Sequence, residues 1–122
     1  MNGLVLSLLA VATSQAIAQP APTTFPAEAV SLSPAVLQET LAGKTYTVKM
    51  ADGKDWRWQF NSNGYFFFNS GGFSDTGKWS TKESALCSEG KKIKASCNEV
   101  RQQGSDLFLK RDNGDVVTMT PQ

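Results

Sequence analysis

From Lys44 onward, apolar residues alternate with polar residues in short runs, and turn sequences interrupt these runs every eight to twelve residues. A period of two residues is typical of β-strands that bury one face. The segment 55–61, DWRWQFN, is a clear example, because Trp56, Trp58 and Phe60 share one face. The turns are marked by the pairs Asp52-Gly53, Asn63-Gly64 and Asn113-Gly114.

The spacing of these runs predicts seven to eight short strands joined by tight turns. Such a pattern is typical of an antiparallel meander that forms a small barrel or a strongly curved sheet. One short helix is expected before the first strand. Ser33 is suited to its N-cap, Pro34 to its first turn and Gly43 to its end. The face that docks this helix on the core is expected to carry Val36, Leu37, Thr40 and Leu41. The fold class is therefore mainly β with one short N-terminal helix.

The first 18 residues have the pattern of a secretory signal peptide. An apolar run from Leu4 to Ala12 precedes Ala16-Ile17-Ala18, a small-x-small site, and we expect cleavage before Gln19. The alternative, a membrane anchor, needs about 20 apolar residues, and this run has nine. We therefore expect a periplasmic or secreted protein with no stable membrane insertion after cleavage.

The remaining chain divides into a Pro-rich segment at 19–33, expected to be flexible, and a single β domain at 34–122. Cys87 and Cys97 are the only cysteines. In an exported chain they are expected to form one disulfide. The alternatives are a metal pair and a catalytic thiol. Two thiolates lack the further ligands that zinc needs, and there is no histidine to activate a thiol.

The absence of histidine excludes the commonest hydrolytic machinery, including the Ser-His-Asp triad and histidine-ligated zinc. We therefore predict no catalytic residue, no cofactor and no metal. The formal net charge of +1 provides no long-range field for nucleic acid, so no nucleic-acid partner is expected.

Several short motifs resemble a family of small secreted proteobacterial proteins of unknown function. They are GKTY, DWRWQF, NGYFF, GKWS, LC and CNEVR, followed by LFLKR, and they extend from about Leu41 to Val117. The resemblance implies no catalytic residue. Gly77-Lys78-Trp79 is also similar to the glycine-x-tryptophan strand of lipocalin-like barrels. In those barrels the element normally comes first, whereas here it lies in the middle of the chain.

Ten of the twelve aromatic residues fall between residues 46 and 79. One interpretation is an aromatic surface or cavity for a small apolar molecule, a glycan ring or a partner loop. Tyr65, Phe67 and Phe73 are the candidate binding residues, because they lie opposite the main core face or beside glycines. The alternative is that large rings simply fill one half of a small barrel.

The segment between the cysteines contains Lys91, Lys92 and Lys94, which are further candidates for binding. They are suited to an acidic partner or an anionic component of the envelope. The alternative is an ordinary solvated loop.

These observations favour a non-enzymatic periplasmic or secreted binding module for an unknown protein or small molecule in the envelope. The first alternative is a proteinaceous inhibitor or immunity-type partner of an envelope enzyme, which would present rigid loops. A hydrolase that uses only carboxylates, drawn from Asp52, Asp55 and Asp75, is a further alternative.

Overall fold

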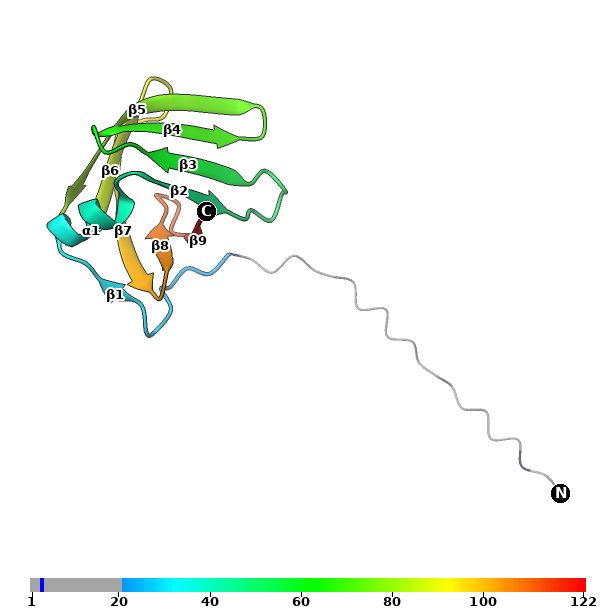
Figure 1. Cartoon of the computed structure of the whole chain (residues 1–122). Helices are drawn as coiled ribbons and strands as arrows, with labels where there is room; N and C mark the ends of the chain where they lie inside the picture. Colours follow the sequence, from blue (N-terminus) through cyan, green and yellow to red (C-terminus); the bar gives the residue numbers. More distant parts are fainter. Residues whose placement is uncertain (1–2, 4–20) are drawn as a thin grey trace.

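A computed structural model describes Gly3 and residues 21–122 of the chain (Figure 1). Apart from Gly3, the predicted signal peptide at 1–18 lies outside the described residues, as do Gln19 and Pro20. Within the described part, no helix has the length and apolar character needed to cross a membrane.

Eight antiparallel strands form a closed barrel in which each strand pairs with its neighbours in sequence. The last strand of the barrel pairs with the first strand of the barrel, so the sheet has no free edge around the barrel. The prediction of a mainly β meander is confirmed, and its closure selects the barrel over the curved sheet. The barrel strands are β2 (Lys44–Val48), β3 (Trp56–Phe60), β4 (Tyr65–Ser70), β5 (Phe73–Lys82), β6 (Ala85–Gly90), β7 (Ser96–Gln103), β8 (Asp106–Lys110) and β9 (Val116–Pro121).

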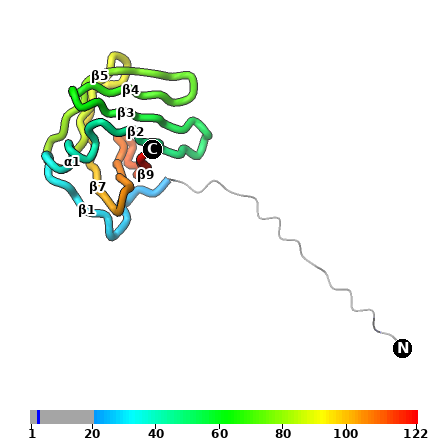
Figure 2. Tube along the Cα trace, viewed as in Figure 1, coloured from blue at the N-terminus to red at the C-terminus, as the bar shows by residue number. Residues whose placement is uncertain are grey.

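The seam between β2 and β9 is short. Backbone pairing joins Tyr46 to Pro121 and Thr47 to Thr120. The backbone N–H of Gln122 adds a 2.9 Å bond to the carbonyl of Thr45, and Figure 2 shows the end of the chain beside β2. A few bonds near the C-terminus therefore close the barrel.

A ninth strand, β1 (Val30–Ser31), pairs with β7 outside the barrel. This strand belongs to the segment 19–33, which the sequence predicted to be flexible, and the described residues before it make further contacts with the barrel wall. The guanidinium of Arg101 lies 4.3 Å from the ring centroid of Phe25. The backbone N–H of Val116 donates to the carbonyl of Pro22 at 2.7 Å.

Helix α1 (Pro34–Leu41) begins as predicted, with the Ser33 hydroxyl accepting the backbone N–H of Val36 at 3.3 Å. Leu37 and Leu41 are completely buried, so the helix docks through them. Val36 was predicted to share this face but is exposed. This helix of eight residues, about two turns, presents a narrower face to the barrel than the sequence pattern implied.

Helix α1 covers one end of the barrel. The Tyr46 hydroxyl donates to the carbonyl of Thr40 at 3.2 Å, and the Thr81 hydroxyl donates to the carbonyl of Pro34 at 2.8 Å. Figure 1 shows the helix opposite the turns that join β2 to β3 and β4 to β5. This end of the barrel is therefore filled by leucines and tied to the strands by hydrogen bonds.

The inward phase of the strands forms the core. Both tryptophans that the alternation assigned to the core, Trp58 and Trp79, are buried. The Trp79 indole N–H donates to the carbonyl of Asn61 at 3.0 Å. The fully buried side chains in the strands are those of Tyr46, Val48, Phe60, Phe66, Leu86, Val100, Leu107 and Met119.

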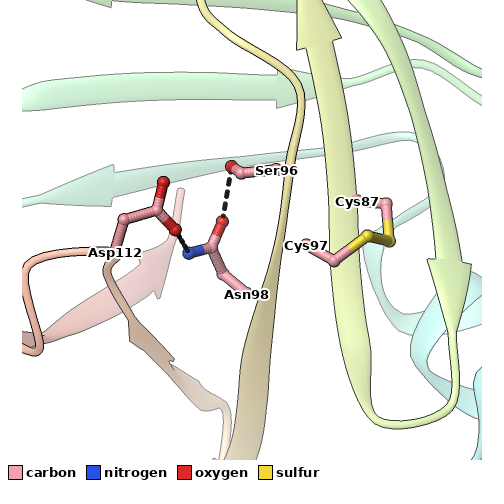
Figure 3. The surroundings of a disulfide bond; sticks show 5 residues. All are labelled: Cys87, Ser96, Cys97, Asn98 and Asp112. Atoms are coloured by element: carbon pink, nitrogen blue, oxygen red, sulfur yellow. Dashed lines mark hydrogen bonds between the residues drawn. A yellow bond between two sulfur atoms is a disulfide. The ribbon is translucent and has the colours of Figure 1, made fainter.

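The predicted disulfide is confirmed. Cys87 and Cys97 face each other directly across β6 and β7, with a Cα–Cα distance of 4.0 Å (Figure 3). Leu86 and Ser88, the neighbours of Cys87, are buried on the inner face. By strand alternation the disulfide lies on the outer face of the barrel.

Removing this disulfide is expected to destabilise the protein without changing its fold. A cross-link between residues separated by ten positions contributes about 2 to 3 kcal/mol, or roughly 10 °C in the melting temperature of a small domain. Cys87→Ser, Cys97→Ser and the double variant should show a similar loss by circular dichroism. Reductant should lower the melting temperature of the wild type and leave that of the double variant unchanged. Equal insensitivity of both proteins would contradict the prediction.

Candidate functional site

Four connections lie at the barrel end opposite α1, because alternate turns of an antiparallel meander share one end. We call this end the mouth. Its connections are the segments 49–55, 71–72, 91–95 and 111–115.

A cavity of about 380 Å³ lies at the mouth, within the range of roughly 300–1,000 Å³ that is usual for small-molecule sites. Side chains from β3 and β4 form an aromatic wall, and those from β6, β7 and the segment 111–113 contribute most of the polar groups. The cavity is lined by Trp56, Trp58, Phe68, Ser88, Ile93, Ser96, Asn98, Leu109, Arg111, Asp112 and Asn113.

The aromatic wall consists of three rings in edge-to-face contact. The ring centroids lie 6.4 Å apart for Trp56 and Trp58, 5.7 Å for Trp58 and Phe68, and 5.5 Å for Trp56 and Phe68. This geometry is favourable for aromatic quadrupoles and fixes the rings relative to one another. The guanidinium of Arg111 lies 5.1 Å from the Trp56 ring centroid and adds a cation–π contact at the rim.

The indole N–H of Trp58 is buried and has no hydrogen-bond partner among the residues that the structure describes. Its side chain is only 7% exposed. Leaving such a donor unpaired costs free energy, and native proteins rarely do so. The other buried tryptophan, Trp79, does pair its N–H. Trp58, which lines the mouth cavity, therefore carries a polar group that the described part of the fold does not satisfy.

The polar wall is held by a side-chain network (Figure 3). The Asn98 amide nitrogen donates to the carbonyl of Lys110 at 3.0 Å and to the Asp112 carboxylate at 2.8 Å. The Ser96 hydroxyl donates to the Asn98 amide oxygen at 3.0 Å. Backbone pairing of β7 with β8 extends only as far as Val100. Asn98 therefore bridges the part of the wall where these two strands separate.

Asp75 organises the connection between β6 and β7. Its carboxylate accepts the backbone N–H groups of Ile93 at 2.7 Å, Lys92 at 3.0 Å and Thr76 at 2.9 Å. A Cβ atom on Gly90 would overlap this carboxylate, so glycine is required there. Burial raises the pKa of Asp75, but hydrogen bonds from Ile93, Lys92, Thr76 and the backbone of Lys91 outweigh burial and lower the pKa below its usual value.

The three aromatic candidates from the sequence do not form one surface. Tyr65 and Phe67 lie on the outer face of β4, where they are 48% and 39% exposed. Phe73 is 42% exposed but is in phase with buried Asp75 on β5. Its ring centroid lies 6.2 Å from that of Phe68. Phe73 therefore belongs to the rim of the mouth, while Tyr65 and Phe67 face outward.

The three candidate lysines lie in the connection at the mouth and are exposed. Only Lys92 contacts an aromatic candidate, with its ammonium 5.4 Å from the Phe73 ring centroid. The same ammonium donates to the carbonyl of Ser74 at 3.1 Å. Lys91 and Lys94 remain exposed on either side of it.

A second groove, of about 710 Å³, lies on the outer face beside the disulfide. Tyr65, Lys78 and Glu89 contribute to its lining. Lys78 and Glu89 are directly paired across β5 and β6, which places opposite charges side by side. Two tryptophans have buried side chains. Trp79, whose N–H is paired, lines the outer groove, and Trp58, whose N–H is unpaired, lines the mouth.

The sequence analysis did not select the residues that line the mouth. Alternation placed Trp56 and Trp58 on the inward face, and the position of Trp56 beside the 49–55 turn was the available signal that it lies at an end of the barrel. Asn98, Arg111 and Asp112 gave no signal, because only barrel closure brings them to the aromatic wall.

The carboxylates considered for hydrolysis have structural partners. Asp52 accepts the backbone N–H of Lys54 at 2.8 Å, and Asp55 accepts that of Met50 at 2.9 Å. The Met50 N–H and the Lys49 ammonium lower the pKa of Asp55, so neither Asp55 nor Asp75 has the raised pKa of a general acid. No group of three or more potential metal ligands occurs within the part of the chain that the structure describes.

Comparison of the chain with protein-family models, with curated proteins and with solved structures gives no match.

The two buried tryptophans provide a matched test of the unpaired donor. Trp58→Phe and Trp79→Phe remove similar volume, but only the second breaks a hydrogen bond, and the Asn61 carbonyl then keeps the backbone N–H of Gly64 at 3.1 Å as its remaining donor. Trp79→Phe is therefore expected to lower the free energy of unfolding by about 0.5 to 1.5 kcal/mol more than Trp58→Phe does. Urea unfolding followed by circular dichroism measures both. An equal loss would indicate that the Trp58 N–H is paired in solution.

Asp75 is expected to make stability depend on acid pH. Its folded pKa lies below the ordinary value of about 4, so the stabilisation is present above that value and is lost as pH falls through the folded pKa. Asp75→Asn should lower the melting temperature at pH 7. In this variant the free energy of unfolding should also change less steeply with pH below about pH 4. The difference in slope corresponds to the uptake of up to one proton on unfolding. The exposed Glu39→Gln is the control. An unchanged slope in Asp75→Asn would contradict the assignment.

Proposed function

We propose that the protein is a non-enzymatic binding module that acts in the periplasm or after secretion and takes a small molecule into the mouth of the barrel. The observation that carries this proposal is the buried, unpaired indole N–H of Trp58 beside a cavity with one aromatic wall. A donor left unpaired by the fold is a group that a ligand can satisfy.

The arrangement of the barrel supports the same site. The fold closes one end with Leu37 and Leu41 of α1, and the other end contains the cavity. The Asn98 network and the Asp75 hydrogen bonds fix the polar wall and the adjoining loop. A site whose walls are fixed before binding loses little entropy when a ligand enters.

The disulfide supports the proposed compartment. Cys87 and Cys97 are bonded in the structure, and such bonds persist in oxidising environments such as the periplasm and the extracellular space. Together with the signal peptide predicted at 1–18, this favours an exported protein.

The β6–β7 connection favours the inhibitor or immunity-type partner as a second candidate. Asp75 and the bond from Lys92 to Ser74 hold this loop, which presents Lys91 and Lys94 to solvent. A fixed basic loop is suited to an acidic protein surface. The double charge reversal Lys91→Glu and Lys94→Glu would slow such an association and leave uptake of a small molecule unchanged.

Blocking the mouth tests the proposed function. Ser96 lines the cavity from β7, so Ser96→Phe places a ring in the space that a ligand would occupy. Ser96 also borders the outer groove, so a variant of the outer face is needed beside it. Protein isolated from the envelope should contain a small molecule that is detected by native mass spectrometry. The blocked variant should retain at least tenfold less of it, which corresponds to about 1.4 kcal/mol.

Two control variants locate the site. Thr118→Phe adds the same ring at an exposed position on β9 and should retain the molecule as the wild type does. The double variant Tyr65→Ala and Phe67→Ala removes the outer aromatic pair and should also retain it. Loss of the molecule in this double variant would place the site on the outer face and overturn the proposal, whatever Ser96→Phe retains, because Tyr65 lines the outer groove and not the cavity.

A further inference from the structure

We infer that the mouth selects a compact, uncharged ring molecule that carries a hydrogen-bond acceptor, and that this acceptor pairs with the indole N–H of Trp58. This inference rests on the proposed function and adds the chemical class of the ligand. It follows from the shape of the aromatic wall, from the unpaired donor and from the charges at the rim.

The aromatic wall favours a ring. Trp56, Trp58 and Phe68 contact one another edge to face. Their rings therefore point in different directions, and the wall contains both ring faces and ring edges. Leu109 and Ile93 extend the apolar lining. A flat or chair-shaped ring buries apolar area against such a surface with little loss of internal freedom. The volume of about 380 Å³ limits the ligand to one or two rings.

The donor requires an acceptor on the ligand. The Trp58 N–H is buried and has no partner, so an apolar ligand would leave it unpaired, whereas a carbonyl or hydroxyl oxygen would satisfy it. The nitrogen has less than 1 Å² of accessible surface, so a neighbouring side chain must move as the ligand enters. Ile93 is the side chain we expect to move, because it is only partly buried and lies in the β6–β7 connection.

The charges at the mouth favour an uncharged ligand. Arg111 and Asp112 are the charged residues that line the cavity. Arg111 lies against the Trp56 ring, and the Asp112 carboxylate accepts from Asn98. The lining of the cavity therefore carries one charge of each sign and no net charge, and the exposed Lys91, Lys92 and Lys94 lie outside this lining. A charged ligand would lose hydration without compensation.

Two sources supply this chemistry, an aromatic amide and an acetamido sugar. We would titrate ¹⁵N-labelled protein with benzamide and with N-acetylglucosamine and follow the three tryptophan indole N–H signals by NMR. At least one of the two probes should move the Trp58 signal downfield, as a new hydrogen bond requires. The Trp79 signal is the internal control and should stay in place, because its N–H already donates to Asn61. The probe that binds identifies the source.

Matched compounds test each element of the inference. Toluene keeps the ring without the acceptor, and benzoate adds a charge to the shape of benzamide. Both should bind at least tenfold more weakly than the amide probe that binds, and Trp58→Phe should weaken that probe by a similar factor. The inference is overturned if neither amide probe moves the Trp58 signal, if toluene or benzoate binds as tightly, or if Trp58→Phe binds the amide probe normally.

Failure of the ligand class is distinguishable from failure of the proposed function. If the small molecule retained from the envelope is charged or acyclic, and Ser96→Phe still loses it, the mouth is a binding site and only its assigned chemistry is wrong. If Ser96→Phe retains it normally, the site itself is wrong.

Discussion

Closure of the eight-stranded sheet is the constraint on which the rest of the structure depends. Once β9 pairs with β2, every strand of the barrel has a barrel neighbour on each side, and the inward phase of each run becomes the core. Short barrels of this kind have an interior just wide enough for side chains to fill. The bulky rings of Tyr46, Phe60 and Phe66 are completely buried in the core, and the leucines of α1 fill one end. In the part of the chain that the structure describes, no helix covers the aromatic side chains at the other end, and the cavity lies among them.

The wall opposite the aromatic rings depends on three local interactions that hold β6 and β7. The disulfide joins the two strands on the outer face, directly beside the inward-facing Ser88 and Ser96. Asp75 holds the connection between the strands through backbone N–H groups, and Gly90 allows its close approach. Asn98 then links β7 to the segment after β8. The Asn98 link replaces backbone pairing that β7 and β8 do not make at this end of the barrel, whereas the disulfide reinforces a pair that already belongs to the β6–β7 ladder.

Local chemistry made much of the fold predictable from the sequence. The alternation of Trp56, Trp58 and Phe60, the turn pairs, the Ser33 cap and the two cysteines each act over a few residues, and their outcomes follow from strand, turn and capping preferences. The face of α1 was predicted less well, because exposed Val36 and buried Leu37 differ only in how the helix meets the barrel. Asp75 was assigned to a turn or strand end, and its role depends on backbone donors about 17 residues away.

The candidate site was less predictable because it is built from residues far apart in the chain. Trp58 and Asp112 line one cavity only because the barrel closes. The sequence predicted that Tyr65, Phe67 and Phe73 lie outside the core, and all three are exposed. Their positions in the strands, however, place them on two different faces. Tyr65 and Phe67 share the outward phase of β4, whereas Phe73 has the phase of buried Asp75 on β5. No sequence pattern showed that Phe73 would be the ring that turns toward the mouth.

The central claim is that the ligand site lies inside the mouth and not on the outer face of the barrel. Isotope-filtered nuclear Overhauser measurements between ¹³C-labelled protein and the unlabelled amide probe that binds would test this claim most directly. Our account predicts contacts from the ring protons of the probe to Trp58, Phe68 and Leu109, which line the cavity together. Contacts to Tyr65 and Phe67, with none to Trp58, would contradict it.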